Sequence, residues 1–287
     1  MSTITIGLVQ LACSENIKIN IEKTIEKVRE AANKGAKIIC LQELYHAEYF
    51  AQNVSVYNYE LAISFKHGAL QMMQQLAKEL CVVLIVPFYE WAAKGIYFNS
   101  AAVFDVDGKY LGTTRKNHIP DGPNYHEKYY FTPGNTGYPV YDTTYGRIGV
   151  GICWDEWFPE VARILTLKGA EILFYPSAIG SEPDYPELAT KQAWTKAISA
   201  HGIHNGVFVA AVNRVGQEKD MTFYGGSFIS NPMGEIICSL EEEGVLIQTI
   251  DTKEIENVRN LLQFLRDRRT DTYLPLLEKE ALKSVEL

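Results

Sequence analysis

The feature that most constrains the fold of this chain is a series of short, wholly apolar segments that alternate with amphipathic ones. Residues 38–41 (IICL) carry no charged side chain, and residues 81–88 (CVVLIVPF) have the same character. A strand with one face in water alternates apolar and polar residues, so an unbroken apolar run indicates burial on both faces. The segments between these runs show helical spacing of apolar residues. The pattern therefore predicts an α/β fold in layers, with helices covering buried sheets.

The same reasoning gives a set of expected elements along the chain. The expected strands are residues 3–10, 38–41, 81–88, 97–104, 110–115, 147–152, 171–175, 207–212, 225–230, 235–239 and 245–250. The expected helices are a first one capped by Ser14 or Asn16 and ending near residue 33, then residues 69–80, 158–168 and 186–204. Residues 105–109 (DVDGK) are expected to turn a hairpin.

The 287 residues contain no low-complexity linker and no short-period repeat. We therefore expect a single domain over residues 1–287. Residues 252–287, which are charged and helical in part, form a C-terminal extension of it. A chain of this length buries enough surface to be stable without a disulfide or a metal ion.

Composition excludes several classes of function. The chain has 27 basic and 35 acidic residues, a net charge of -8. This balance disfavours nucleic-acid binding because phosphate contacts need basic surface.

The five cysteines are scattered without a CxxC pair, which argues against a zinc ribbon or a disulfide scaffold and favours a reducing cytoplasm. The N-terminus has no basic leader, and no run of 18 apolar residues is present, so we expect neither export nor a membrane partner. The sequence has no nucleotide-binding glycine motif and no metal-ligand set, so no cofactor and no metal are expected.

Cys153 is the strongest candidate for a catalytic residue. It follows a predicted buried strand and precedes a helix expected near Phe158, so it would lie at a sharp turn at the carboxyl end of the strand. Such turns expose a nucleophile where open α/β sheets bind ligands, and the backbone N–H of Trp154 would be placed to bind an oxyanion. The alternative is that Cys153 is a small buried apolar residue, as free cysteines commonly are. The other four cysteines are expected to be structural; Cys40 and Cys81, for instance, fall within apolar strands.

Two further candidates also follow predicted strands. Glu43 comes shortly after residues 38–41, and Lys116 comes directly after residues 110–115. A glutamate can take the proton of a thiol, and a lysine can balance the charge of an oxyanion. Taken singly, each is more often a solvated loop or surface residue. The sequence offers six histidines, of which His118 and His126 lie in nearby loops, but no signature pairs any of them with Cys153.

Taken together, three motifs resemble the nitrilase superfamily of carbon–nitrogen hydrolases. They are residues 41–44 (LQEL), 115–120 (RKNHIP) and 149–155 (GVGICWD). The resemblance implies a four-layer αββα sandwich that forms homo-oligomers through its helical layers. It also implies a catalytic set of Glu43, Lys116 and Cys153. Glu127 matches a second glutamate of the superfamily.

A narrower resemblance concerns the substrate. Residues 116–123, 152–160, 174–183 and 264–269 are similar to the branch of the superfamily that acts on N-carbamoylputrescine. This implies a small cationic carbamoyl substrate that is hydrolysed to putrescine, carbon dioxide and ammonia in polyamine biosynthesis. Cys153 would then attack the carbamoyl carbon, and Glu43 would be the general base. Lys116 would stabilise the oxyanion, and Glu127 would orient Lys116 or the substrate.

The residues after the cysteine suggest how the amine would be bound. Relatives that bind a carboxylate are expected to carry arginines there, whereas this chain has Asp155 and Glu156 between two tryptophans. Acids flanked by aromatic rings suit an alkylammonium group. We therefore expect Asp155, Glu156 and Glu182 to bind the amine, with Tyr49 and Trp154 as pocket walls. The alternative for Asp155 and Glu156 is that they are acids favoured at a helix N-terminus.

Two other functions remain open from the sequence. One is a hydrolase of another carbamoyl compound, such as a carbamoyl amino acid, or of a small amide. The other is a catalytically inactive binding protein on the same fold, which would require the loss of Glu43, Lys116 or Cys153; all three are present.

Overall fold

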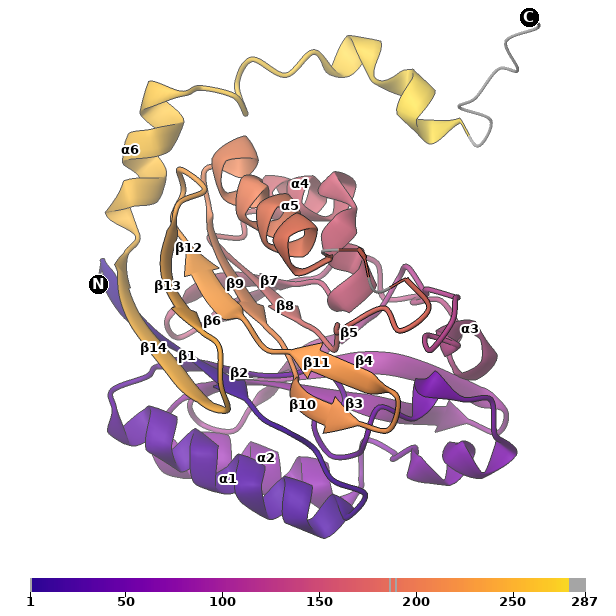
Figure 1. Cartoon of the computed structure of the whole chain (residues 1–287). Coiled ribbons are helices and arrows are strands. Elements are labelled where there is room, and N and C mark those ends of the chain that lie inside the picture. The colour runs from indigo at the N-terminus through magenta and orange to yellow at the C-terminus, as the bar shows by residue number, and fades with distance from the viewer. Residues whose placement is uncertain (1, 186, 189, 279–287) are drawn as a thin grey trace, which may run out of the picture.

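The computed structural model describes residues 2–185, 187–188 and 190–278. Two six-stranded sheets pack face to face, and helices cover the outer face of each, as Figure 1 shows. The predicted four-layer αββα sandwich is confirmed. The middle of each sheet is parallel and is flanked by antiparallel strands.

The first sheet has the strand order β14-β1-β2-β3-β4-β5. Its strands are β1 (Thr3–Gln10), β2 (Ile38–Leu41), β3 (Val83–Ala93), β4 (Ile96–Phe104), β5 (Tyr110–Arg115) and β14 (Gly244–Asp251). Parallel strands need a long crossover, and α1 (Ile17–Asn33) and α2 (Gly68–Leu80) supply it on the outer face. The hairpin predicted at residues 105–109 connects β4 to β5.

The second sheet has the order β13-β12-β9-β8-β7-β6. Its strands are β6 (Val140–Thr143), β7 (Gly146–Val150), β8 (Ile172–Pro176), β9 (Phe208–Val212), β12 (Ser227–Ser230) and β13 (Ile236–Leu240). The crossovers are α4 (Pro159–Leu167) and α5 (Thr190–Asn205). A separate hairpin of β10 (Val215–Glu218) and β11 (Met221–Tyr224) follows β9.

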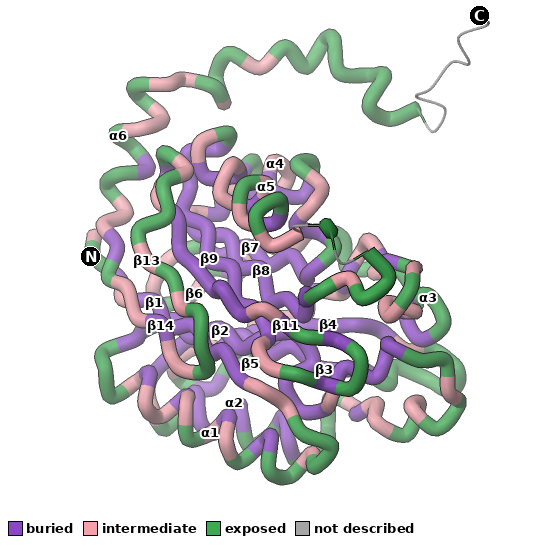
Figure 2. The backbone as a smooth tube through the Cα atoms, in the orientation of Figure 1, coloured by how far each residue is buried: buried purple, intermediate pink, exposed green. Residues whose placement is uncertain are grey.

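The core explains the unbroken apolar runs. In β2, Ile38 and Cys40 belong to the cluster between the two sheets, whereas Ile39 and Leu41 pack with residues of α1 and α2. Both faces of the strand are therefore covered, and the central strands are buried in Figure 2. Because the central strands of each sheet run parallel, their carboxyl ends and the loops that follow them lie at a common edge.

Some predicted boundaries are wrong. Cys81 is not part of a strand: it caps the end of α2 with a left-handed backbone, φ 52°, and is exposed, and β3 begins only at Val83. The helix α5 begins at Thr190 rather than at 186, which itself lies outside the described residues. The cap of α1 is Asn16, whose side chain accepts the N–H groups of residues 18 and 19. The short strands β6, β10 and β11 were not predicted.

The end of the described chain passes over the helices of the second sheet. Ile255 of α6 (Lys253–Leu261) packs into the core between the sheets, and the chain then arches across the top of the molecule in Figure 1. Arg268 and Tyr273 of this segment line a hollow together with Arg163 of α4. This segment carries exposed apolar side chains, among them Phe264, Leu274 and Leu277. Among the described residues, no helix combines the length and the apolarity that crossing a membrane requires.

The two-sheet core gives a first prediction. Ile148 of β7 is fully buried between the sheets. We expect Ile148→Ala to lower the free energy of unfolding by about 3 kcal/mol, because it removes buried methylene groups and leaves a cavity. Urea unfolding followed by circular dichroism measures this. The matched control is Ile19→Ala on α1, where the side chain is 51% exposed and the change should stay within about 0.5 kcal/mol. Equal effects of both substitutions would contradict the assigned core.

Candidate active site

Four of the predicted residues meet at one edge of the sandwich. Glu43 lies two residues after β2, Lys116 directly after β5, and Cys153 three residues after β7. Glu127 begins the short helix α3 (Glu127–Tyr130). All four are buried, and none of the three charged side chains has measurable exposure. Buried charges require partners, so their contacts define what the site can do.

Lys116 lies between the two carboxylates. Its Nζ is 2.9 Å from Oε1 of Glu43 and 2.6 Å from Oε2 of Glu127. Burial by itself would lower the pKa of Lys116, but the charges of Glu127 and then Glu43 outweigh it and raise this pKa well above its usual value. Lys116 is therefore a charged ammonium. Two hydrogen bonds to carboxylates fix its direction, and its third N–H has no partner among the described residues.

The two glutamates are not equivalent. Burial raises the pKa of Glu127; Lys116 opposes this shift and Glu43 adds to it. In Glu43, Oε1 accepts from Lys116 and also from Asn99 Nδ2 at 2.6 Å. The other oxygen, Oε2, is buried and has no hydrogen-bond partner among the described residues. No donor from the described residues occupies this oxygen, so it is available to accept a proton from a nucleophile, as a general base must.

Cys153 lies at a strained turn. It is the first residue of the short 3-10 helix Cys153–Trp157, and its backbone φ is 46°. Residues other than glycine rarely adopt this left-handed conformation. A strained turn of this kind points the side chain of a nucleophile away from the strand that precedes it. Burial raises the pKa of the Cys153 thiol well above its usual value; Glu43 raises it further, and Lys116 opposes the shift. The thiol is therefore neutral at pH 7 and needs a base for activation.

A cavity of about 180 Å³ opens onto Cys153, and we call it the inner pocket. Its lining residues are Pro120, Asp121, Gly122, Pro123, Tyr125, Glu127, Cys153, Trp154, Ile179 and Glu182. The two predicted binding residues Trp154 and Glu182 thus lie beside the cysteine. Burial, and then the charge of Asp184, raise the pKa of the half-buried Glu182. No lysine or arginine occurs among the lining residues, so the pocket presents carboxylates and apolar surface.

Asp155 does not face the pocket, and its predicted role in amine binding is wrong. It is fully buried, and its carboxylate accepts the backbone N–H groups of Asn117, His118 and Ile152 at 3.0–3.2 Å. His118 Nδ1 adds a contact at 2.7 Å. Asp155 therefore joins the loop after Lys116 to the turn that carries Cys153.

The predicted role of Glu156 in amine binding is also wrong. It is fully buried, and it accepts from Ser177 Oγ and Trp194 Nε1, both at 2.7 Å. Burial raises its pKa well above the usual value, and the two hydrogen bonds reduce this shift. Glu156 thus anchors the turn to β8 and α5 rather than binding substrate.

Tyr49 does not line the inner pocket as expected. It is fully buried, and its hydroxyl donates to Glu127 Oε1 at 2.6 Å. Together with Lys116 on Oε2, this hydrogen bond fixes both oxygens of Glu127. Tyr49 is therefore a positioning residue. Of the two histidines singled out earlier, His118 is held by Asp155, and His126 lies 3.9 Å from Asp121.

Two residues near the site were missed from the sequence. Asn99 interrupts the apolar run of β4, and Arg214 is the second residue after the apolar strand β9. Arg214 is fully buried and donates to the carbonyl groups of Glu43 and Leu44. It also pairs with Glu218 at 2.8 Å, which in turn accepts the N–H of Tyr49. A polar residue inside or just after an apolar strand is the signal that points to both.

Comparison with known proteins finds relatives over almost the whole chain. The carbon-nitrogen hydrolase family matches residues 5–260. An N-carbamoylputrescine amidase from Solanum lycopersicum is 44% identical over 96% of this chain and 95% of that protein. A citrullinase from Francisella tularensis is 40% identical over 97% of this chain and 100% of its own length. The crystal structure of a carbon-nitrogen hydrolase from Helicobacter pylori G27 superposes with a TM-score of 0.93 at 40% identity, covering 96% of this chain and 99% of that one.

The Tyr49–Glu127 hydrogen bond gives a prediction about pH. This bond lowers the pKa of Glu127, so Tyr49→Phe should raise that pKa. Protonation of Glu127 would then weaken its pairing with Lys116 at a higher pH than before. We expect the acidic limb of the kcat/KM profile for ammonia release to move to higher pH, with a loss of about tenfold at neutral pH.

The matched control is Tyr57→Phe, where the side chain is 76% exposed. This variant should keep the profile of the parent protein. If Tyr49→Phe lowered kcat/KM equally at every pH, Tyr49 would act through packing alone.

Proposed function

This chain belongs to the carbon-nitrogen hydrolase family, and we propose that it hydrolyses N-carbamoylputrescine to putrescine, carbon dioxide and ammonia. The observation that carries the proposal is the inner pocket, where Cys153 and the half-buried Glu182 line one small cavity. Relatives named N-carbamoylputrescine amidase, at 43–45% identity over nearly the whole chain, support it.

In the proposed first half-reaction, Oε2 of Glu43 takes the proton of the Cys153 thiol. The resulting thiolate attacks the carbamoyl carbon and forms an S–C bond, and the electron pair of the C=O bond moves onto oxygen. When this oxyanion collapses, one of the two C–N bonds breaks. The protonated Glu43 returns its proton to the departing nitrogen. A thioester on Cys153 remains whose carbonyl still carries the other nitrogen, that is, an S-thiocarbamate.

In the second half-reaction, Glu43 takes a proton from a water molecule, and the hydroxide attacks the thioester carbon. Collapse of this second oxyanion breaks the C–S bond and releases a carbamate, and the proton on Glu43 returns to the sulfur. The carbamate then loses carbon dioxide and leaves the second amine. One water is consumed for each ammonia, carbon dioxide and diamine released.

Lys116 acts in both halves as a fixed donor. Its ammonium is held by Glu43 and Glu127, so the third N–H requires no reorientation as the oxyanion forms. The backbone N–H of Trp154 is the proposed second donor. Glu127 keeps Lys116 charged and in place, which a buried ammonium could not maintain without a carboxylate.

Glu182 and Trp154 are the proposed groups that bind the amine. Glu182 supplies a carboxylate inside a largely apolar pocket, where an ion pair is weakly screened. Trp154 is 39% exposed at the same cavity, and its ring face attracts an ammonium group. The pocket offers no arginine fork, which a substrate carboxylate would favour.

A carbamoyl amino acid is the second candidate substrate, since the citrullinase from Francisella tularensis is 40% identical to this chain. Such a substrate carries a carboxylate that would meet Glu182 without a cationic partner from the lining residues. The reading as an inactive binding protein is disfavoured, because Glu43, Lys116 and Cys153 are all present and converge. The homo-oligomer, the cytoplasmic location and the place in polyamine biosynthesis remain predictions.

The proposal predicts a substrate order. Ammonia release should be fastest, in kcat/KM, with N-carbamoylputrescine, and at least about tenfold slower with citrulline, N-carbamoyl-β-alanine and a small aliphatic amide. Cys153→Ala should abolish turnover and keep the circular dichroism spectrum and melting temperature of the parent protein. A preference for citrulline would refute the proposed substrate, and turnover by Cys153→Ala would refute the mechanism.

Amine binding by Glu182 predicts a separate kinetic signature. Glu182→Gln should raise KM for N-carbamoylputrescine about tenfold and change kcat little, because the ammonium is bound alike in the ground and transition states. Glu26→Gln, an exposed acid on α1, is the charge-matched control and should leave KM unchanged. An unchanged KM in Glu182→Gln would remove this residue from the binding site.

A further inference from the structure

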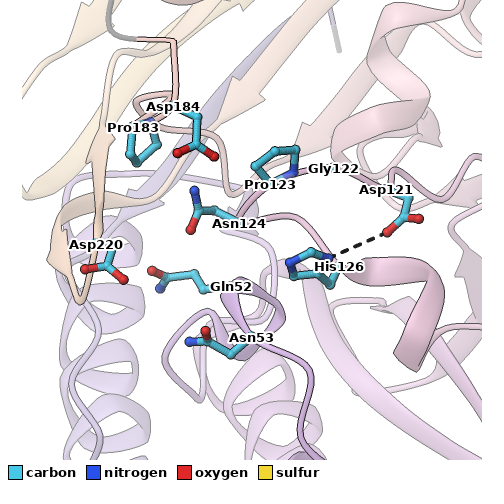
Figure 3. Close-up of a pocket in the computed structure, with 10 residues that line it drawn as sticks. All are labelled: Gln52, Asn53, Asp121, Gly122, Pro123, Asn124, His126, Pro183, Asp184 and Asp220. Carbon is cyan, nitrogen blue, oxygen red and sulfur yellow. Dashed lines mark ion pairs between the residues drawn. The ribbon is translucent and has the colours of Figure 1, made fainter.

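A second, larger hollow adjoins the inner pocket. It has a volume of about 830 Å³, and Figure 3 draws its lining residues. We call it the outer hollow; it is lined by Gln52, Asn53, Asp121, Gly122, Pro123, Asn124, His126, Pro183, Asp184 and Asp220. Residues 121–123 line both cavities, and Glu182 of the inner pocket is followed by Pro183 and Asp184 of the outer hollow. The two cavities therefore share a border.

The outer hollow is acidic. Asp121, Asp184 and Asp220 come from three different segments, and no lysine or arginine occurs among the lining residues. The one basic group there is His126, 3.9 Å from Asp121. Glu182 adds a further carboxylate just inside. Carboxylates gathered in a concave surface focus a negative potential that favours cations.

Gln52 is an independent sign of a ligand. Only 3% of this residue is exposed, and its Nε2 donates to the carbonyl of Tyr49 at 3.2 Å. This bond fixes the amide so that Oε1 is left buried without a hydrogen-bond partner in the described structure. In Figure 3 the side chain points from its ribbon toward Asp220, into the hollow. An unpaired amide oxygen is costly and calls for an N–H donor.

The spacing of the acids distinguishes between two kinds of cation. Over the described part of the chain, no three His, Cys, Asp or Glu side chains lie close enough together to hold a metal ion. The three aspartates of the outer hollow are therefore spread apart. Separate carboxylates around one cavity of about 830 Å³ match a cation whose charges are themselves separated along a chain.

We propose that the outer hollow is a second cation site, which binds the outlying ammonium groups of a linear polyamine with three or more amino groups. This inference rests on the proposed function only in taking the inner pocket as the site of the first amine. The inner pocket is too small for a long polyamine, so the remainder of the chain extends across residues 121–123. There Asp184, Asp220 and the Gln52 amide oxygen receive its further N–H groups. A polyamine bound in this way blocks access to Cys153.

Direct binding tests the site without any turnover. Isothermal titration calorimetry of the full chain with spermine, a linear tetraamine, at low ionic strength should give a dissociation constant at least about tenfold lower than that of putrescine. In the double variant Asp184→Asn/Asp220→Asn, spermine should bind about tenfold more weakly, as expected for the loss of two partly screened ion pairs. Putrescine binding should change less than about twofold.

The charge-matched control is Glu22→Gln/Glu26→Gln on α1, which removes two exposed acids that do not line the hollow. It should bind spermine as the parent protein does. Equal weakening in both double variants would show a general charge effect and overturn the proposal, as would equal affinities for putrescine and spermine. Because no substrate is present, these results stand apart from the hydrolysis assay, whose failure would concern the proposed function alone.

Gln52→Met tests the amide oxygen separately. It keeps the length of the side chain and removes the acceptor, so it should weaken spermine binding about fivefold, as expected for one hydrogen bond to a charged donor. A melting temperature close to that of the parent protein would show that the fold is intact. Unchanged spermine binding in such a folded variant would exclude Gln52 from the site and overturn the proposed geometry.

Discussion

The rest of the site depends on the burial of one ammonium group. Lys116 is fully buried, and its charge persists because Glu43 and Glu127 both lie within 2.9 Å of Nζ. Without either carboxylate the buried ammonium would be uncompensated, at a cost of several kcal/mol. Two carboxylates around one ammonium leave an excess of negative charge, which helps to keep the neighbouring thiol protonated at rest. The arrangement thus stores a neutral nucleophile beside a base that can activate it.

This geometry requires loops from different strands to be held together, and buried polar side chains do so. Asp155 joins the loop after Lys116 to the turn of Cys153 through backbone N–H groups. Arg214 holds the carbonyl groups of the Glu43 loop, and its partner Glu218 binds the N–H of Tyr49. Each of these groups is fully or nearly fully buried and makes several hydrogen bonds, which is how a buried polar network becomes rigid.

The apolar runs predicted a layered α/β fold, and the strand ends predicted that Glu43, Lys116 and Cys153 share an edge. The four-layer arrangement and the role of Glu127 came from the family resemblance. The sequence could not tell how the acids beside the nucleophile are oriented. Asp155 and Glu156 read as pocket residues, yet their partners are backbone N–H groups and the side chains of Ser177 and Trp194, distant in sequence. The prediction that Tyr49 is a pocket wall was wrong for the same reason, since its contact with Glu127 joins residues 78 positions apart. The local sequence pattern does not reveal whether a polar side chain faces the pocket when its hydrogen-bond partners are distant in sequence.

The central claim is that Cys153, activated by Glu43, carries the carbamoyl group as a thioester. The most direct measurement is mass spectrometry of the protein quenched in acid during turnover of N-carbamoylputrescine, followed by peptide mapping. The account predicts an adduct on Cys153, whose mass identifies the nitrogen that leaves first, and no adduct in Cys153→Ala. An adduct on another residue, or steady turnover with Cys153 unmodified at every time point, would contradict it.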